Sequence, residues 1–282
     1  MKNPLESLEH IPEKIIPSTD NIIDWFNQPK EDARQYLVEA IKNTDNLSPQ
    51  EASSLIFNSR KLVKEYANCK TIFEDAKSKF ENSADISKLD ADWTAMFFDK
   101  ARLVSKEDMQ IIWGNILAQE VNEPGCINPS LLHTLSIMTY KQAEFFCNIA
   151  RFCFKSYKNN IVNPLIFYST NVIAYKDSDI DDKKLRELHR LGLIEYSPQS
   201  EFIFDNKAVF TSGTKVITIY GDPNNQNKIK AGNVIFTSDG QILYSIIDDD
   251  YKKYRHDIVD FTVEKFLNRG CAVNINGNYV QY

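Results

Sequence analysis

One carboxylate, Glu120, stands in the most regular pattern of the chain, the stretch WGNILAQEVNEPGCINPSLLHTL at residues 113–135. Trp113, Leu117 and Glu120 are spaced at helical intervals, so they share one face of a predicted helix. Glu120 falls in the last turn of that helix, where the negative end of the helix dipole disfavours a carboxylate by roughly 0.3–1 kcal/mol. The carboxylate therefore needs a compensating partner.

Two kinds of partner would satisfy Glu120. The first is the set of free backbone N–H groups at the start of the next helix, which Asn128 and Pro129 open. The second is a reacting group or a metal ion, with Glu120 as a general base or a ligand. We expect the first arrangement, in which Glu120 links two helices across the turn at Pro124 and Gly125. The motif then has a structural or interaction role.

Other groups that could do chemistry do not form a recognised motif. The four histidines are too far apart in sequence for a local metal site such as HExxH. They are His10, His133, His189 and His256. The carboxylates at residues 248–250 and 177–182 could bind Mg²⁺ or Ca²⁺, but both runs fit helix capping better. We therefore expect no catalytic residue, metal or cofactor, and a metal-dependent hydrolase built from scattered carboxylates is kept as an alternative.

Basic residues gather on one predicted helix in the C-terminal part of the chain. They are Lys183, Lys184, Arg186 and Arg190. In a winged-helix domain, such a helix would contact nucleic acid. The carboxylates of Asp181, Asp182 and Glu187 balance the charge, so we expect a solvated helix face, with nucleic-acid binding as the alternative.

Charge is distributed unevenly along the 282 residues. The net charge is −6; residues 1–150 hold 16 basic and 23 acidic groups, and residues 151–282 hold 17 and 16. A mildly acidic first half and a nearly neutral second half do not give the general attraction to phosphate backbones that is typical of nucleic-acid binding proteins. With 43% hydrophobic residues, the chain can bury one large core or two modest ones.

The cysteines indicate a reducing compartment. There are five, at positions 69, 126, 147, 153 and 271, and none forms a CxxC pair. We expect reduced thiols, and place Cys147 and Cys153 together in one helical apolar stretch. The sequence has no signal-peptide pattern and no apolar run of about 18 residues. We expect a soluble cytoplasmic protein without a membrane partner.

The N-terminal and central regions are predicted to be helical. Residues 1–45 contain four prolines, an apolar patch and a helix at 31–45, and could serve as a docking arm. The patch consists of Ile22, Ile23, Trp25 and Phe26. Ser48, Pro49 and Glu51 then form a capping box with proline, which predicts a long helix to about Phe80. Residues 46–160 are predicted to form a helical bundle.

Three shorter helices are predicted inside this bundle. Residues 105–108 (SKED) would cap the first, with Ser105 as the N-cap, Asn128 and Pro129 would open the second, and the capping box at residues 139–142 (TYKQ) would open the third. Tight connections between short helices favour compact packing.

The spacing of the apolar residues changes beyond Lys155 from the helical period to one that suits strands. Residues 161–282 are predicted to form an α+β domain. We expect short strands, or a strand and a loop, at 160–168 and 171–175, a strand at 193–197, and β-rich segments at 208–222 and 233–247. Helices are expected to end at Gly192 and to cover 250–269, and a hairpin is expected around Asn276 and Gly277. A helix followed by a strand pair is typical of a winged-helix-like module. The fold class is therefore α+β.

Residues 92–146 resemble the bacterial domain-of-unknown-function family 2806. The resemblance rests on three phrases, WTAMFFDKARLVS, WGNILAQE and PGCINPSLL, followed by MTYKQAEFF. The sequence departs from the family pattern at Ser130 and Leu131, where the pattern has arginine and threonine. The phrases LHRLGLIEY and FTSDGQIL fit the family more loosely. The resemblance implies a bacterial or prophage origin and a mobile-element or phage-defence neighbourhood, and it implies no activity.

These observations favour a non-catalytic adaptor or sensor that binds other proteins in a phage-defence or prophage-encoded system. We expect a protein partner, either another subunit of a defence complex or a phage protein, and a homo-oligomer is also compatible. The alternatives are a nucleic-acid-binding protein with a winged-helix-like C-terminal domain, and a metal-dependent hydrolase.

Overall fold

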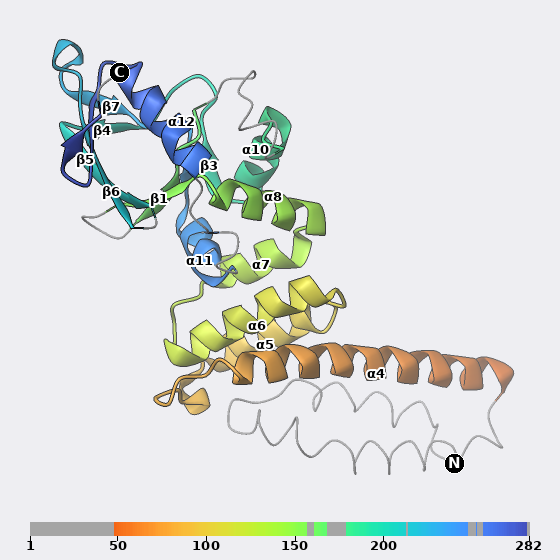
Figure 1. The fold of residues 1–282 in the computed structure, drawn as a ribbon. Coiled ribbons are helices and arrows are strands. Elements are labelled where there is room, and N and C mark those ends of the chain that lie inside the picture. Colours follow the sequence, from red (N-terminus) through yellow and green to blue (C-terminus); the bar gives the residue numbers. More distant parts are fainter. Residues whose placement is uncertain are drawn as a thin grey trace. The chain divides into compact units, whose positions relative to one another are not determined.

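The computed structural model describes residues 48–156, 161–167, 179–212, 214–247, 252 and 256–280. The chain divides into two compact units, Met1–Ser136 and Ile137–Tyr282. The predicted docking arm, the strand predicted at 171–175 and the carboxylates at 248–250 lie outside the described residues. The fold class is α+β, as predicted: the first unit is helical where it is described, and all strands lie in the second unit (Figure 1).

A long helix, α4 (Pro49–Lys77), opens the described part of the first unit. The predicted capping box is confirmed, because the Ser48 side chain accepts from the Glu51 N–H and the Glu51 carboxylate accepts from the Ser48 N–H. The helix ends three residues before Phe80, the predicted end. No residue of α4 before Glu65 is buried. From Glu65 onward, one face of the helix is buried, and its residues are Glu65, Asn68, Cys69, Ile72, Phe73 and Ala76.

Three further helices and a short 3₁₀ turn follow α4 in the described part of this unit. They are η4 (Ile86–Lys88), α5 (Ala91–Ala101), α6 (Glu107–Asn122) and α7 (Pro129–Ile137). The predicted opening of α7 at Pro129 is confirmed. The predicted cap of α6 is wrong, because its N-cap is Lys106 and no side chain caps it. The α5–α6 connection fixes the start of α6: the Gln110 side chain donates from Nε2 to the Val104 carbonyl, 2.9 Å away.

Aromatic side chains and one glycine hold these helices together. The Phe97 ring lies 5.2 Å from each of the rings of Trp93, Phe98 and Trp113. Gly114 of α6 lies directly against α4, where an added Cβ would come within 3.2 Å of the Asp75 Cβ. The core of the first unit therefore lies between α5, α6 and the second half of α4.

The second unit contains four described helices, at α8 (Tyr140–Ala150), α10 (Asp182–Arg190), α11 (Ser238–Ile246) and α12 (His256–Leu267). The capping box predicted for α8 is confirmed at Thr139 and Gln142. Cys153 was predicted to be helical, but α8 ends at Ala150 and Cys153 begins a strand. Residues 238–246 were predicted to be β-rich, yet they form α11, because Thr237 caps a helix there by accepting from the Gly240 N–H.

The main sheet is antiparallel and has six strands in the order β10-β9-β6-β5-β1-β2. Their bounds are β1 (Cys153–Ser156), β2 (Val162–Pro164), β5 (Lys207–Ser212), β6 (Lys215–Tyr220), β9 (Ala272–Ile275) and β10 (Asn278–Tyr279). The predicted hairpin is confirmed, because Asn276 and Gly277 both have positive φ, 50° and 92°. One face is packed: the Phe210 ring lies 6.4 Å from Phe154 and 5.8 Å from Phe204.

Two short strand pairs accompany the main sheet. These are β3 (Ile194–Tyr196) with β8 (Val234–Phe236), and β4 (Ile203–Asp205) with β7 (Lys228–Lys230). The start of α11 fits against the turn before β3: Thr237 donates from Oγ1 to the Gly192 carbonyl at 2.6 Å, and an added Cβ on Gly240 would lie 2.0 Å from the Leu193 carbonyl oxygen. Only glycine fits at position 240.

Candidate functional site

The Glu120 carboxylate is almost completely buried at the end of α6, with 2% of the residue exposed. Its Oε1 accepts from the Gly125 N–H at 2.6 Å, and its Oε2 accepts from the Ile127 N–H at 2.8 Å. The Cys126 thiol lies 3.7 Å from Oε2. Both oxygens are therefore occupied by the turn that follows α6. We call this arrangement, made of Glu120 and residues 124–127, the Glu120 corner.

The partners of Glu120 differ from those expected. The N–H groups that it accepts from belong to the turn before Asn128, and the first turn of α7 is not involved. The physical reason is the tight turn directly after α6. Gly125 has φ +87°, so the chain turns back there toward the end of the helix, and the N–H groups of the turn reach the carboxylate first. The Ile127 peptide also accepts, through its carbonyl, from Trp93 Nε1 at 3.0 Å. The corner thus joins α5, α6 and the turn.

The other residues predicted for this motif have structural positions. Trp113 and Leu117 are 0% and 1% exposed and belong to the core of the first unit. Pro124 and Asn128 flank the turn. Trp113 and Leu117 therefore hold helices together, whereas Pro124, Gly125 and Asn128 are exposed.

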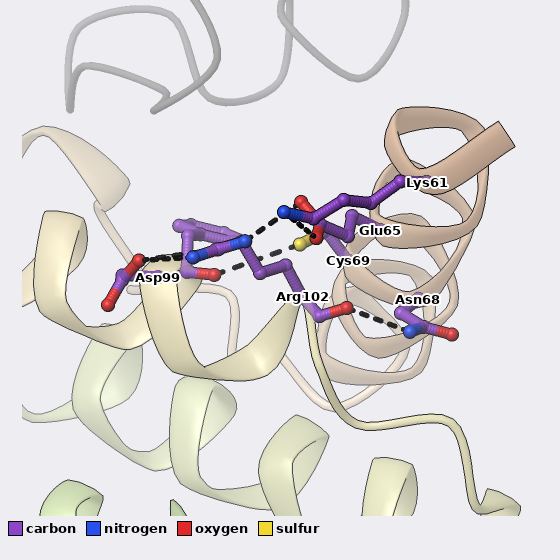
Figure 2. A network of polar contacts seen from close by, with 7 residues as sticks. Lys61, Glu65, Asn68, Cys69, Asp99 and Arg102 are labelled. Atoms are coloured by element: carbon purple, nitrogen blue, oxygen red, sulfur yellow. Dashed lines mark hydrogen bonds and ion pairs between the residues drawn. The ribbon is translucent and has the colours of Figure 1, made fainter. Parts of the chain in front are cut away.

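A second polar cluster, which the sequence did not reveal, joins α4 to the end of α5 (Figure 2). Glu65 is 8% exposed, and its Oε2 accepts from Arg102 Nη1 at 2.9 Å. Asp99 accepts from the same guanidinium at 3.0 and 3.2 Å, and Lys61 lies 3.8 Å from the other Glu65 oxygen. We call these residues the Glu65 network. Burial opposes the charge of Arg102, but hydrogen bonds to Glu65 and Asp99 outweigh it, so the pKa of Arg102 is raised.

The same network holds the connection between α5 and α6. Asn68 is buried and donates from Nδ2 to the Arg102 carbonyl at 2.8 Å, at the C-cap of α5. Gln110 donates to both the Asn68 side chain and the Val104 carbonyl. The pairs Lys61–Glu65 and Asp99–Arg102 have helical spacing and could be read from sequence. The contact between Glu65 and Arg102 spans 37 residues and has no local signal.

The thiols of Cys69, Cys126 and Cys153 are protonated near neutral pH. Burial, followed by the charge of Glu120, raises the pKa of Cys126 to about 12. Burial also raises the pKa of Cys69 to about 12, and that of Cys153 well above its usual value. Because the thiolate is the nucleophilic form, these thiols are poor nucleophiles.

The basic residues predicted to contact nucleic acid all lie on α10. Lys184 forms ion pairs with Asp179 and Asp181, and Arg186 pairs with Asp182 at 2.8 Å. Lys183 and Arg190 are exposed and lie seven residues apart, on the same face. Asp181 is the N-cap of α10, and Asp182 lies in its first turn, as expected of capping carboxylates. Half of the predicted basic surface is thus neutralised locally.

The predicted histidines are dispersed as well. His133 lies on α7, and His189 on α10, where its Nδ1 is 3.0 Å from the Ile194 carbonyl oxygen. His10 lies outside the described residues. Within the part of the chain that the structure describes, no three His, Cys, Asp or Glu side chains come together as a metal site would require. No described helix is long and apolar enough to cross a bilayer.

Comparison with known proteins adds the family. No curated protein and no solved structure matches the chain. One family model matches residues 58–253, and its description is "Protein of unknown function (DUF2806)". The match covers more than two thirds of the chain and includes the Glu120 corner, the whole Glu65 network and α10. The chain therefore belongs to the DUF2806 family of proteins of unknown function.

Proposed function

We propose that this protein is a non-catalytic adaptor or sensor that binds another protein through the first half of α4, within a phage-defence or prophage-encoded system. The observation that carries the proposal is a group of large apolar side chains on α4 that are exposed. Ile56, Phe57 and Val63 have 52%, 69% and 60% of their surface exposed. Ile56 and Val63 lie two turns apart on one face. We call these three residues the α4 apolar surface.

The first half of α4 lacks a packing partner among the described residues. Residues 49–64 contain no buried side chain, and at 1.5 Å per residue they extend about 24 Å from the point where α4 meets the core of its unit. Most of the stability of a helix in water comes from packing an apolar face rather than from propensity. Three exposed large apolar residues within eight positions therefore indicate a surface that another molecule covers.

The charges beside this surface indicate the chemistry of the partner. Arg60, Lys61 and Lys64 flank it, while Glu51 is the only carboxylate in residues 49–64. An amphipathic helix with apolar residues on one face and carboxylates at its edges would match both features. We therefore propose an acidic amphipathic helix of a second protein as the occupant.

Two positive observations support a role without catalysis. The carboxylate of the family motif, Glu120, is fully used by backbone N–H groups. The raised pKa values of Cys69 and Cys126 keep these thiols protonated. The link to phage defence rests on membership of the family alone.

Site-specific photocrosslinking in the native bacterium tests the proposal. A photoreactive amino acid replaces Phe57 in the full chain, and the crosslinked peptide is identified by mass spectrometry. We expect a crosslink to an acidic amphipathic helix of one other protein, and its loss in the double variant Ile56→Ser/Val63→Ser. Ile111→Ser is the matched control, because Ile111 is also exposed (43%) but belongs to another helix, α6. Crosslinks confined to residues 1–47 or to a second copy of the chain would rule the proposal out.

A second candidate function, duplex-DNA binding by a winged-helix-like module, is favoured by one arrangement. α10 is followed by β3, which pairs with β8, and the start of α11 contacts the turn between α10 and β3. Lys183 and Arg190 would then contact phosphates. A mobility-shift assay with the full chain at about 50 mM salt tests it: the double variant Lys183→Glu/Arg190→Glu should abolish the shift. An unchanged shift, or none with the wild-type chain, would reject this candidate.

A further inference from the structure

The six-stranded sheet has one packed face and one face that stays accessible. Side chains alternate between the two faces of a strand. Phe154, Phe210, Ile217, Ile219 and Val273 are at most 4% exposed and define the packed face. At the β2 edge the opposite side of the sheet is covered too, because Val162 and Pro164, which pair with Lys155 and Cys153, are buried. The alternate positions from Lys155 of β1 to Tyr279 of β10 form the outer sheet face, and none of them is buried. They are Lys155, Lys207, Val209, Thr211, Val216, Thr218, Tyr220, Ala272, Asn274 and Tyr279.

The register of the strands brings these residues together. Lys207 is paired with Tyr220, Lys155 with Thr211, and Asn274 with both Thr218 and Tyr279. Residues opposite one another in an antiparallel pair lie on the same face, about 5 Å apart. The outer sheet face is therefore continuous from β1 through β5, β6 and β9 to β10, which are neighbouring strands in the sheet.

Two tyrosines and a lysine lie together toward the β10 edge of this face. The rings of Tyr220 and Tyr279 have centroids 6.2 Å apart and planes inclined by 31°, and Tyr279 is 63% exposed. The Lys207 ammonium lies 5.4 Å from the Tyr220 ring centroid. A hydrogen bond with Tyr220 raises the pKa of Tyr279, so its hydroxyl is neutral at physiological pH. The rings therefore offer uncharged π-surfaces with a cation beside them.

The charges of the outer sheet face have one sign. Lys155 and Lys207 are its charged residues, and none of the ten positions carries a carboxylate. The two lysines are four residues apart in register, since Lys155 pairs with Thr211, which is about 14 Å along β5 from Lys207. The same face also carries the hydroxyl groups of Thr211 and Thr218 and the amide of Asn274. Such a surface suits a polyanion with flat rings better than it suits an apolar helix.

We propose that the outer sheet face binds single-stranded nucleic acid. Unpaired bases stack on Tyr220 and Tyr279, and the phosphates lie near Lys155 and Lys207. Aromatic side chains on an open sheet, flanked by cations, are a general solution for this ligand, because every base has a π-face. A duplex hides these faces in its stack, so the surface selects single strands. The proposal is independent of the α4 apolar surface and of α10.

Fluorescence anisotropy with the full chain tests this inference. The probe is a labelled single strand of about 16 nucleotides, in DNA and RNA forms, and the same DNA as a duplex is the competitor. At about 50 mM salt we expect binding of the single strand that weakens as salt rises. Tyr220→Ala and Tyr279→Ala should each weaken binding about tenfold, while Tyr220→Phe should keep it within about twofold, because phenylalanine retains the stacking ring.

Matched variants distinguish binding at the outer sheet face from general attraction between nucleic acid and positive charge. Lys155→Ala/Lys207→Ala should weaken binding and reduce its salt dependence, whereas Lys77→Ala/Lys141→Ala removes the same charge from exposed positions of α4 and α8 and should change neither. Melting curves confirm that each variant is folded. Three outcomes would overturn the inference: no binding to the single strand at about 50 mM salt, equal affinity in the tyrosine-to-alanine variants, or an equal loss in the Lys77→Ala/Lys141→Ala control. Capture of a protein by this face in place of nucleic acid would also overturn it.

Discussion

Two buried carboxylates of the first unit are stabilised in different ways. Glu120 accepts from two backbone N–H groups that lie five and seven residues further along the chain. Glu65 faces the guanidinium of Arg102, 37 residues away, on another helix. The first needs no countercharge, because peptide dipoles stabilise it. The second depends on how two helices pack. A carboxylate in a motif can therefore be explained by local backbone geometry, while one outside any motif can be central to the tertiary structure.

The largest effect is expected at the Glu120 corner. Glu120→Ala removes two charge-assisted hydrogen bonds and leaves the N–H groups of Gly125 and Ile127 without an acceptor, so the free energy of unfolding should fall by about 3 kcal/mol. Glu120→Gln keeps one acceptor oxygen and should lose about half of that. Urea unfolding followed by tryptophan fluorescence measures both, because all three tryptophans lie in the first unit.

The control for this prediction is the neighbouring carboxylate. Glu123→Ala, at an exposed position, should change stability by less than about 0.5 kcal/mol. A Glu120→Ala protein as stable as the wild type would show that the corner does not hold α6 to the turn.

A smaller effect is expected in the Glu65 network. Arg102→Met leaves the Glu65 carboxylate partly buried without its guanidinium, and should destabilise the first unit by about 2 kcal/mol. Replacing Glu65 as well, in Glu65→Leu/Arg102→Met, should restore part of the loss, because the uncompensated charge is gone. Lys61→Met is the control: Lys61 is 55% exposed and 3.8 Å from Glu65, and should contribute little.

High salt distinguishes the two sites. About 1 M salt should reduce the difference between wild type and Arg102→Met, since part of this pair is accessible to solvent, and leave the Glu120→Ala difference nearly unchanged. If both differences responded to salt equally, the contrast between backbone and side-chain stabilisation would be wrong.

The smallest effect separates the sites by thiol chemistry. Cys126 lies beside Glu120 and Cys69 beside Glu65, and the pKa of each is raised to about 12. At pH 8 only about one thiol in ten thousand is then a thiolate, so alkylation by iodoacetamide should be slow. Glu120→Gln removes a charge that raises the pKa of Cys126, and should speed its alkylation several-fold without changing that of Cys69. Peptide mapping by mass spectrometry reports both rates. Equal acceleration at both cysteines would indicate general loosening instead.

Local signals explain the parts of the fold that were predictable. The capping boxes at Ser48 and Thr139, the start of α7 at Pro129 and the hairpin at Asn276 and Gly277 each depend on residues within four positions. The prediction for the start of α6 was wrong for the opposite reason. The first residue of α6 is set by the α5–α6 turn and its contact with Gln110, and not by the hydroxyl of Ser105. The prediction for the residues of α11 was wrong because a short apolar run fits a helix or a strand equally well.

The sequence by itself determined the starts of α4, α7 and α8, the hairpin turn, the α+β class and the family, because backbone N–H and carbonyl groups near the ends of these elements are satisfied by neighbours in the chain. The tertiary structure alone decided which side chains meet. The pairing of Glu65 with Arg102, the approach of Gly240 to Leu193 and the tyrosine pair of the outer sheet face all join residues distant in sequence. Contacts of this kind depend on how whole helices and strands pack, which no local pattern records.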